Sequence, residues 1–258
     1  NCPDDEENAI FKMPDYIGKM LDNKWLGSKT KQGFYKKIKG EDGKSVILSL
    51  DLKTLEYKEQ KRVKFATLDM VKPIDDLTKR TAMLIMGQDK AAEFYRLMFG
   101  GLFAYSANRI PEIANDLYKI DDAIKSGFGW SLGPFETWDI FGFDKGIELI
   151  EKQGKKVAPW LKEMKDSGAK TFYKRENGQK LYYDIESKSY KVIPGTEELV
   201  ILDALRDDHT VWKNADSTIV DLGDGIINLE FHTKMNTIGS GVIQGIQKAL
   251  DLAETEYK

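Results

Sequence analysis

The segment Gly168-Ala-Lys-Thr-Phe-Tyr-Lys-Arg175 has a close copy earlier in the chain, Gly27-Ser-Lys-Thr-Lys-Gln-Gly-Phe-Tyr-Lys-Lys37. A glycine turn, an aspartate and a tyrosine follow each copy at nearly constant separations. The numbering differs by 138 between Phe34 and Phe172, by 135 between Gly43 and Gly178, and by 133 between Tyr57 and Tyr190. A long helical stretch, roughly residues 68–165, precedes the second copy only. The sequence therefore predicts a repeat of roughly 135 residues whose first copy lacks its front, and we interpret the chain as a piece of a larger protein.

Each copy ends in a pattern that is typical of a β-hairpin. Residues 45–57 alternate and are rich in β-branched side chains, with turn character at Asp51-Leu-Lys-Thr54. In the second copy the corresponding runs are Gln179–Asp184 and Tyr190–Ile193. Alternation around turn residues indicates two antiparallel strands, so we expect one hairpin in each copy.

Helical periodicity dominates between the hairpins. Apolar residues from Ile110 to Ile124 recur at helical spacing, which predicts a helix over 110–124 that ends at Gly127 to Gly129. The other expected helices are residues 14–23, 77–100 as one helix or two broken near Gly87, 143–153 and 157–166. The fold class is therefore mainly α, a helical bundle with β-hairpin attachments.

The last third of the chain has a different character. Thr196 is a plausible N-cap for a helix through Leu205. Asp224-Gly225 lies between two apolar runs, 217–222 and 226–231, which predicts a second kind of hairpin, and a helix is expected over 238–255. A two-stranded hairpin with one helix is too small to be independently stable, so this end also reads as unfinished.

The composition excludes several classes of function. The net charge is −3, with 31% charged residues of both signs interspersed, which argues against nucleic acid or an anionic membrane as the main partner. No apolar run approaches the roughly 20 residues that span a bilayer. Cys2 is the single cysteine, so no disulfide framework or cysteine-rich metal site is expected, and a cytoplasmic location is the plain expectation.

The chain contains no self-sufficient catalytic set. A dinucleotide fingerprint needs a third small residue, but Gly239-Ser-Gly241-Val-Ile-Gln244 has glutamine there. We interpret His209 as a solvated loop residue and His232 as a strand-end residue, with a substrate-loop role for His232 left open. Metal-ligand spacings are absent. The carboxylate pairs Asp75–Asp76 and Asp121–Asp122 are expected to be helix-face or N-terminal charges.

One polar pair allows two interpretations. Asn108 and Arg109 precede the apolar run that begins at Ile110. The Asn108 amide is either the cap of that helix, with Arg109 paired to a nearby acid, or a group presented to a substrate. The physics of the sequence favours the cap.

Three motifs resemble the C-terminal domain of the 3-hydroxyacyl-CoA dehydrogenase family. They are Phe103-Ala-Tyr-Ser-Ala-Asn-Arg-Ile-Pro-Glu-Ile113, the run from Ile120 to Asp139, and Trp25-Leu-Gly-Ser-Lys-Thr-Lys-Gln-Gly-Phe-Tyr35. Larger members of this family carry the domain twice, which is similar to the repeat. The tail, Ile219–Phe231 with Lys234-Met-Asn236, resembles the opening hairpin and first loop of the enoyl-CoA hydratase (crotonase) family. Fusion proteins of fatty-acid β-oxidation join these two enzymes.

The resemblance implies a domain order. Residues 1–66 correspond to the end of a first dehydrogenase C-terminal-type repeat, 67–195 to a complete second repeat, and 196–258 to a linker helix and a truncated crotonase-like ββα start. In the family, NAD and a catalytic His–Glu pair belong to an N-terminal Rossmann domain, which is absent here. The resemblance implies no cofactor and no catalytic residue in this segment. Only Asn108 matches a substrate-binding motif, and it does so in the second copy, which usually plays a structural part.

These observations lead to one expectation and two alternatives. The parent protein is expected to oxidise 3-hydroxyacyl-CoA to 3-oxoacyl-CoA with NAD, while this segment is an inert scaffold. Its expected partners are the missing Rossmann and hydratase domains, acyl-CoA through the parent, and a second subunit in a homodimer. One alternative is a stand-alone, non-catalytic interaction or acyl-CoA-binding module. The other is a degenerate dehydrogenase that uses Asn108 with a Rossmann domain supplied in trans.

Overall fold

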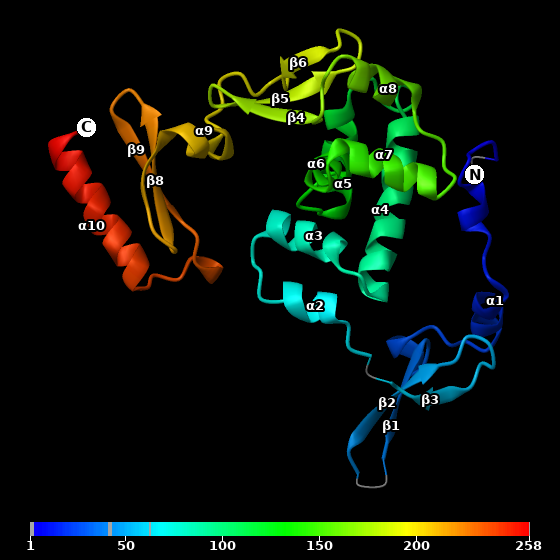
Figure 1. Cartoon of the computed structure of the whole chain (residues 1–258). Coiled ribbons are helices and arrows are strands. Elements are labelled where there is room, and N and C mark those ends of the chain that lie inside the picture. Colours follow the sequence, from blue (N-terminus) through cyan, green and yellow to red (C-terminus); the bar gives the residue numbers. More distant parts are fainter. Residues whose placement is uncertain (1–2, 41–42, 62, 258) are drawn as a thin grey trace. The chain divides into compact units, whose positions relative to one another are not determined.

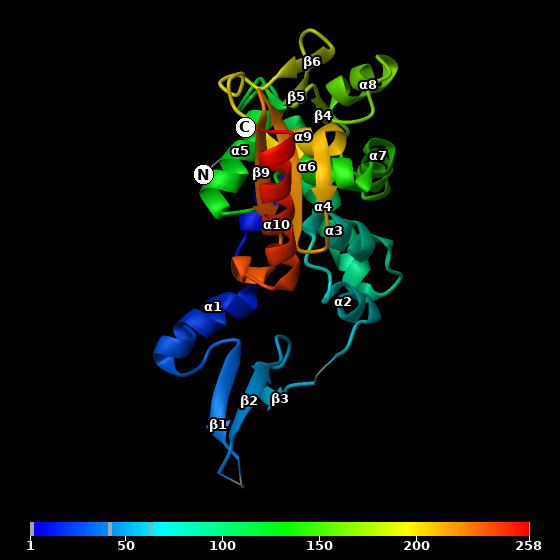
Figure 2. The same cartoon turned by 90° about the vertical axis from the view of Figure 1, so that its left-hand side faces the viewer.

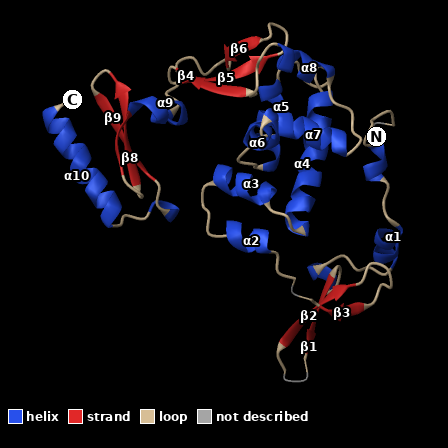
Figure 3. Ribbon diagram, viewed as in Figure 1, coloured by secondary structure: helices blue, strands red, loops and turns tan. Residues whose placement is uncertain are grey.

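The structure, a computed structural model, describes residues 3–40, 43–61 and 63–257. Its chain divides into two compact units, Asn1–Lys64 and Phe65–Lys258 (Figures 1 and 3). Helices and three small antiparallel sheets make up both units, so the predicted mainly α class with β attachments is confirmed at this level. Cys2 and the Glu41–Asp42 part of the first repeat lie outside the described residues.

The first unit is a short helix followed by a three-stranded sheet. Its elements are η1 (Asn8–Phe11), α1 (Asp15–Asp22), η2 (Ser28–Thr30), β1 (Tyr35–Lys39), β2 (Ser45–Leu50) and β3 (Tyr57–Glu59). The predicted turn between β2 and β3 is confirmed, because the Asp51 carboxylate accepts hydrogen bonds from the amides of Lys53 and Thr54. The prediction of a two-stranded hairpin is corrected, because β1 pairs with β2 and the sheet has three strands. Four of the five β1 residues are polar or aromatic and no apolar alternation marked it.

The second unit begins with seven helices. They are α2 (Ala66–Val71), α3 (Leu77–Met86), α4 (Lys90–Asn108), α5 (Leu117–Phe128), α6 (Pro134–Phe141), α7 (Phe143–Lys152) and α8 (Pro159–Asp166). The long helix α4 contacts α3, α6 and α7 (Figure 1). The break near Gly87 is confirmed. Asp89 caps α4 by accepting from the Ala92 amide, and a Cβ on Gly87 would lie 2.1 Å from the Thr67 hydroxyl oxygen.

The core of this unit is aromatic. The rings of Phe103 and Trp138 stack with centroids 4.8 Å apart, and both side chains are fully buried. Phe172 joins them from the strand region, 5.0 Å from the Trp138 ring. Gly146 makes room for the indole, because a Cβ there would lie 1.7 Å from Trp138 Nε1. Helices α4, α6 and α7 therefore pack around the Trp138 side chain.

The predicted helix over 110–124 is wrong in its first half. Helix α4 runs through Asn108, and α5 starts only at Leu117. Pro111 lacks the N–H that a helix interior needs, and it disfavours helical backbone at Ile110. Ile120 and Ile124 do lie on α5, which ends at Phe128 with Gly129 in the left-handed region, as predicted.

The second sheet repeats the first in detail. It consists of β4 (Tyr173–Glu176), β5 (Gln179–Asp184) and β6 (Ser189–Val192), again as a meander of three strands where a hairpin was predicted. The Tyr183 amide donates to the Phe172 carbonyl at 2.8 Å, as the Leu50 amide does to Phe34 at 2.8 Å. The Tyr57 hydroxyl donates to the Gly33 carbonyl, and the Tyr190 hydroxyl donates to the Thr171 carbonyl. Each of these carbonyls lies two positions before the tyrosine that opens the first strand of its sheet. An Asp–Lys pair seven residues apart occurs in both copies, Asp51 with Lys58 and Asp184 with Lys191.

Helix α1 corresponds to α8, since each has eight residues and precedes its sheet. The connection differs in length. Twelve positions separate Asp22 from Phe34, whereas six separate Asp166 from Phe172. The first copy therefore carries six extra residues, in the loop that contains η2.

The C-terminal part consists of a three-stranded sheet between two helices in sequence. Its elements are α9 (Leu202–His209), β7 (Thr210–Lys213), β8 (Ser217–Gly223), β9 (Ile226–Phe231), η3 (Lys234–Asn236) and α10 (Ser240–Thr255). The predicted Asp-Gly hairpin and the last helix are confirmed, but β7 adds a third strand. Helix α10 lies along β8 and β9 (Figures 1 and 2).

The helix predicted from Thr196 is wrong. The Thr196 hydroxyl donates to the Ile193 carbonyl instead of accepting from a helix amide, and α9 begins six residues later. His209 is consequently the last residue of α9 and not a loop residue. Among the described residues, no helix is long and apolar enough to cross a membrane. The identities predicted for residues 1–66, 67–195 and 196–258 stay predictions.

Candidate functional site

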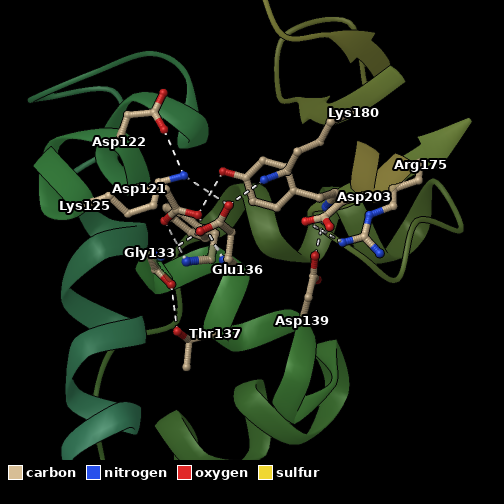
Figure 4. A network of polar contacts seen from close by, with 12 residues as sticks. Asp121, Asp122, Lys125, Gly133, Glu136, Thr137, Asp139, Arg175, Lys180 and Asp203 are labelled. Carbon is tan, nitrogen blue, oxygen red and sulfur yellow. Dashed lines mark hydrogen bonds and ion pairs between the residues drawn. The ribbon is translucent and has the colours of Figure 1, made fainter. Parts of the chain in front are cut away.

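A cleft of about 550 Å³ opens between α6, the second sheet and α9. Its lining is rich in charge of both signs: Glu136, Asp139, Lys174, Arg175, Lys180, Asp203 and Asp207. Behind it lies a network of polar contacts that centres on three carboxylates (Figure 4). Titratable side chains therefore gather both on the walls of this cleft and behind it.

Asp121 is the innermost of the three carboxylates. Its side chain is fully buried, although it was predicted to be a helix-face charge. It accepts from the amides of Phe135 at 2.8 Å and Glu136 at 3.0 Å, at the start of α6, and from the Tyr173 hydroxyl at 2.9 Å. The signal for this burial was its position one helical turn after Leu117, on the apolar side of α5. Asp122, on the opposite side, is exposed as predicted.

Asp139 joins α6 to the second sheet. Its two oxygens accept from the amides of Phe172 at 2.8 Å and Tyr173 at 2.9 Å. Burial raises the pKa of Asp139 to about 7, and burial likewise raises the pKa of Asp121 to about 7, while the amide donors act in the opposite direction. The backbone N–H groups therefore stabilise the charged form of both carboxylates, while burial disfavours it.

Glu136 caps the same helix. Its carboxylate accepts from the Gly133 amide at 2.8 Å and pairs with Lys125 at 3.1 Å and with Lys180. These donors hold the pKa of Glu136 below its usual value against the effect of burial. Lys180 also lies 4.4 Å from the centre of the Tyr173 ring. Gly133 is required here, because a Cβ would lie 2.3 Å from the Asp121 side chain.

The arrangement serves to join elements. Asp121 ties α5 to α6, Asp139 ties α6 to β4, and Glu136 ties α6 to β5 through Lys180. The oxygens of all three are taken up by amides, lysines and a tyrosine hydroxyl. The described residues contain no group of three or more His, Cys, Asp or Glu side chains that could hold a metal ion.

The structure places Asn108 at the C-terminal end of α4. Its side-chain amide donates to the carbonyls of Ala104 at 2.8 Å and Lys156 at 2.9 Å. The predicted N-cap role is therefore wrong, because the following helix does not start there. Arg109 pairs with Glu112 at 2.8 Å, as predicted. Asn108 and the three carboxylates are not brought together around the cleft, and its substrate-binding role stays a prediction.

The remaining sequence candidates have local structural partners. A ring nitrogen of His232 lies 2.8 Å from the Thr218 hydroxyl on β8. Gly241 lies in the first turn of α10, where a Cβ would lie 2.1 Å from an oxygen of Asp216 in the loop before β8. The negative charge of the Asp216 carboxylate beside this helix start would oppose the binding of a pyrophosphate group there. Asp76 caps α3 by accepting from the Lys79 amide, in line with its predicted N-terminal role.

Comparison with known proteins gives a consistent result. No protein-family model and no solved structure matches the chain. A Bacillus subtilis protein named probable 3-hydroxyacyl-CoA dehydrogenase is 39% identical over 256 residues, which is 99% of this chain. Two Rickettsia proteins named putative fatty acid oxidation complex trifunctional enzyme, from R. felis and R. prowazekii, are 23% and 21% identical over 98% of it.

The chain spans about a third of the length of these relatives, 32% of the Bacillus protein and 31% of each Rickettsia protein. The alignments cover the first unit, the helical bundle and most of the C-terminal part alike. Over nearly its whole length the chain is therefore similar to part of a protein named probable 3-hydroxyacyl-CoA dehydrogenase and to part of proteins named putative fatty acid oxidation complex trifunctional enzyme, in line with the resemblance that its motifs carry.

Proposed function

We propose that the chain is a non-catalytic scaffold segment of an NAD-dependent 3-hydroxyacyl-CoA dehydrogenase. The observation that carries this proposal is the 39% identity to a protein of that name over 99% of the chain. The parent would oxidise 3-hydroxyacyl-CoA to 3-oxoacyl-CoA by hydride transfer to NAD, in a cytoplasmic pathway of fatty-acid oxidation. Predicted Rossmann and hydratase-like domains would be its packing partners, and a homodimer its assembly.

The disposition of polar groups supports the scaffold role. A dehydrogenase needs a base for the hydroxyl proton and a nucleotide site beside it. In the described residues the buried carboxylates are engaged by backbone amides, and the Asn108 amide is engaged by two carbonyls. These groups hold elements together, and none of them combines with a histidine in the cleft.

The first experiment is the consumption of NADH with acetoacetyl-CoA by this chain alone at high protein concentration. We expect no turnover above background. Saturable turnover would contradict the scaffold role. Adding a separately produced Rossmann domain of a 3-hydroxyacyl-CoA dehydrogenase tests the trans-acting alternative: activity that appears in the mixture and disappears in Asn108→Ala would favour a degenerate dehydrogenase.

A binding function for acyl-CoA is a second candidate, favoured by one observation. Lys174, Arg175 and Lys180 line the cleft, and cations of this kind bind phosphate groups. Glu136, Asp139, Asp203 and Asp207 on the same walls oppose an anion, so we expect weak binding or none. Calorimetric titration with CoA and acetoacetyl-CoA decides the matter, with Lys174→Ala as the matched variant because Lys174 makes no ion pair with the carboxylate network.

A further inference from the structure

The two copies of the repeat differ in what covers them. In the second copy, Phe172 is fully buried and its ring lies 5.1 Å from Phe135 and 5.6 Å from Phe143. In the first copy the equivalent Phe34 is 46% exposed. The neighbouring Tyr35 is 58% exposed. The same sheet thus carries a covered aromatic face in one copy and an uncovered one in the other.

The uncovered face keeps the geometry of the covered one. Tyr16 on α1 meets Phe34 edge-on, with centroids 6.5 Å apart and planes at 68°. In the second copy Trp160 on α8 meets Phe172 at 6.0 Å and 71°. Met20 on α1 is buried, as is Met164 at the equivalent position of α8. The first copy therefore presents a preformed aromatic surface and not a disordered remnant of one.

A polar element of the covered face also lacks its counterpart. Asp139 of α6 accepts from the two successive amides of Phe172 and Tyr173. The equivalent amides belong to Phe34 and Tyr35. Among the residues that the structure describes, no carboxylate accepts from either of these amides. A buried N–H pair needs an acceptor, so whatever covers Phe34 has to supply one.

We propose that the face formed by Tyr16, Phe34 and Tyr35 is a docking surface for a helical bundle built like α4–α7, which places an aspartate under the Phe34 and Tyr35 amides. The second copy on the same chain identifies this occupant, since α6 and α7 supply both the aromatic cleft for Phe172 and the carboxylate. The bundle of this chain cannot be that occupant while its own α8 and β4 fill the cleft. The proposal names the partner of the scaffold role and rests on that role. Its readout is amide exchange and not turnover, so the two can fail separately.

The test extends the full chain with the bundle that it already contains. Residues 66–157 are added a second time, joined to Pro14, which corresponds to Ala158 in front of α8. Residue-resolved amide hydrogen exchange is then followed at Phe34 and Tyr35, with Phe172 and Tyr173 as internal references. We expect exchange at Phe34 and Tyr35 to slow by about 100-fold or more relative to the unextended chain, as for amides that open only with their domain. Unchanged exchange would overturn the proposal.

Two variants separate docking from nonspecific protection. Asp139→Asn in the added copy alone should restore fast exchange at Phe34 and Tyr35 while Phe172 and Tyr173 stay protected. Because that change could unfold the added bundle, Phe34→Ser is made as well, with Ile38→Ser as the matched exposed control on β1. Loss of protection at Tyr35 in Phe34→Ser but not in Ile38→Ser supports the proposal, and equal effects contradict it. Protection of Phe34 in the unextended chain that grows with concentration would show a second copy to be the occupant and would also overturn it.

Discussion

Asp121 and Asp139 show how single buried carboxylates shape this molecule. Each is held by two backbone amides, yet burial raises the pKa of each to about 7. The folded chain therefore binds more protons than the unfolded chain at pH values between the ordinary pKa of 3.8 and about 7. Stability falls with rising pH wherever the folded state holds the extra protons.

We accordingly expect the thermal midpoint of the helical bundle to fall as pH rises from about 4.5 to about 7.5. Each unit of pKa difference corresponds to about 1.4 kcal/mol, so a drop of at least several degrees is expected. The lowered pKa of Glu136 acts with the opposite sign, but only below its usual value of 4.5. Melting followed by tryptophan fluorescence measures the trend, and Asp139→Asn should flatten it. A midpoint that rises across this window would contradict the assignment.

Gly146 and Gly101 form a matched pair on two helices of one bundle. A methyl group on Gly146 would meet the Trp138 indole at 1.7 Å, whereas one on Gly101 would have as its nearest neighbour the Lys155 side chain at 3.6 Å. Gly146→Ala should cost about 3 kcal/mol or more through overpacking. Gly101→Ala should be neutral or stabilise by up to ~1 kcal/mol through helix propensity. Urea denaturation of both variants measures the contrast, and equal effects would mean that the indole is not packed as described.

Asn108 yields a prediction that separates structure from chemistry. Its amide joins the end of α4 to the segment before α8 through two carbonyls. Asn108→Ala should lower the free energy of unfolding by about 1–3 kcal/mol, the usual cost of losing such bonds. Unchanged stability, measured by urea denaturation, would indicate that these bonds are not formed and that the amide is free for a ligand.

At the scale of elements, Arg206 connects α9 with β9. Its guanidinium donates to both oxygens of Glu230, at 2.7 and 2.6 Å, and these bonds hold the pKa of Glu230 below its usual value. Lysine cannot reproduce this two-pronged contact. Arg206→Lys should therefore destabilise the C-terminal sheet by about 1 kcal/mol, a value kept small because the Arg206 side chain is partly exposed to solvent. Faster amide exchange in β9, with exchange in β5 unchanged, is the expected signature.

Elements were predictable from the sequence where local signals stand alone. The Asp-Gly turn gave the β8–β9 hairpin, and the periodicity of α10 was unbroken. Errors arose where one residue overrides a pattern. Pro111 divides an apolar stripe that otherwise reads as one helix, and the Thr196 hydroxyl bonds backwards to Ile193. The outer strands β1 and β4 were not predicted because their sequences are largely polar, and β7 was not predicted because it has only four residues and follows directly on a helix.

The carboxylate network was less predictable than the elements that carry it. Asp121, Glu136 and Asp139 lie on two helices, and each also contacts the region of the second sheet, more than thirty residues away in the sequence. Asp139 accepts from the Phe172 amide, Asp121 accepts from the Tyr173 hydroxyl, and Glu136 pairs with Lys180. No spacing in the sequence encodes such a meeting. Only the place of Asp121 on the apolar side of its helix hinted at burial.

For the molecule as a whole, the two copies of the sheet should differ in stability. Phe172 is enclosed by the bundle, while Phe34 leaves nearly half of its surface in water. Buried apolar area is the main source of folding free energy, so residues 35–59 should open at lower denaturant concentration than residues 173–192. Amide exchange measured along a guanidinium series tests this order. Simultaneous opening of both sheets would mean that the first unit is stabilised by contacts beyond its own.

The six extra residues between α1 and β1 have a practical meaning. They enlarge one connection without altering the aromatic pair or the hydrogen bonds on either side of it. The comparison of the two copies indicates that this connection tolerates six additional residues. The equivalent position in the second copy, between Ser167 and Thr171, is therefore a suitable place to splice in a short reporter peptide or a fluorophore tag, from which the state of the bundle could be read in living cells.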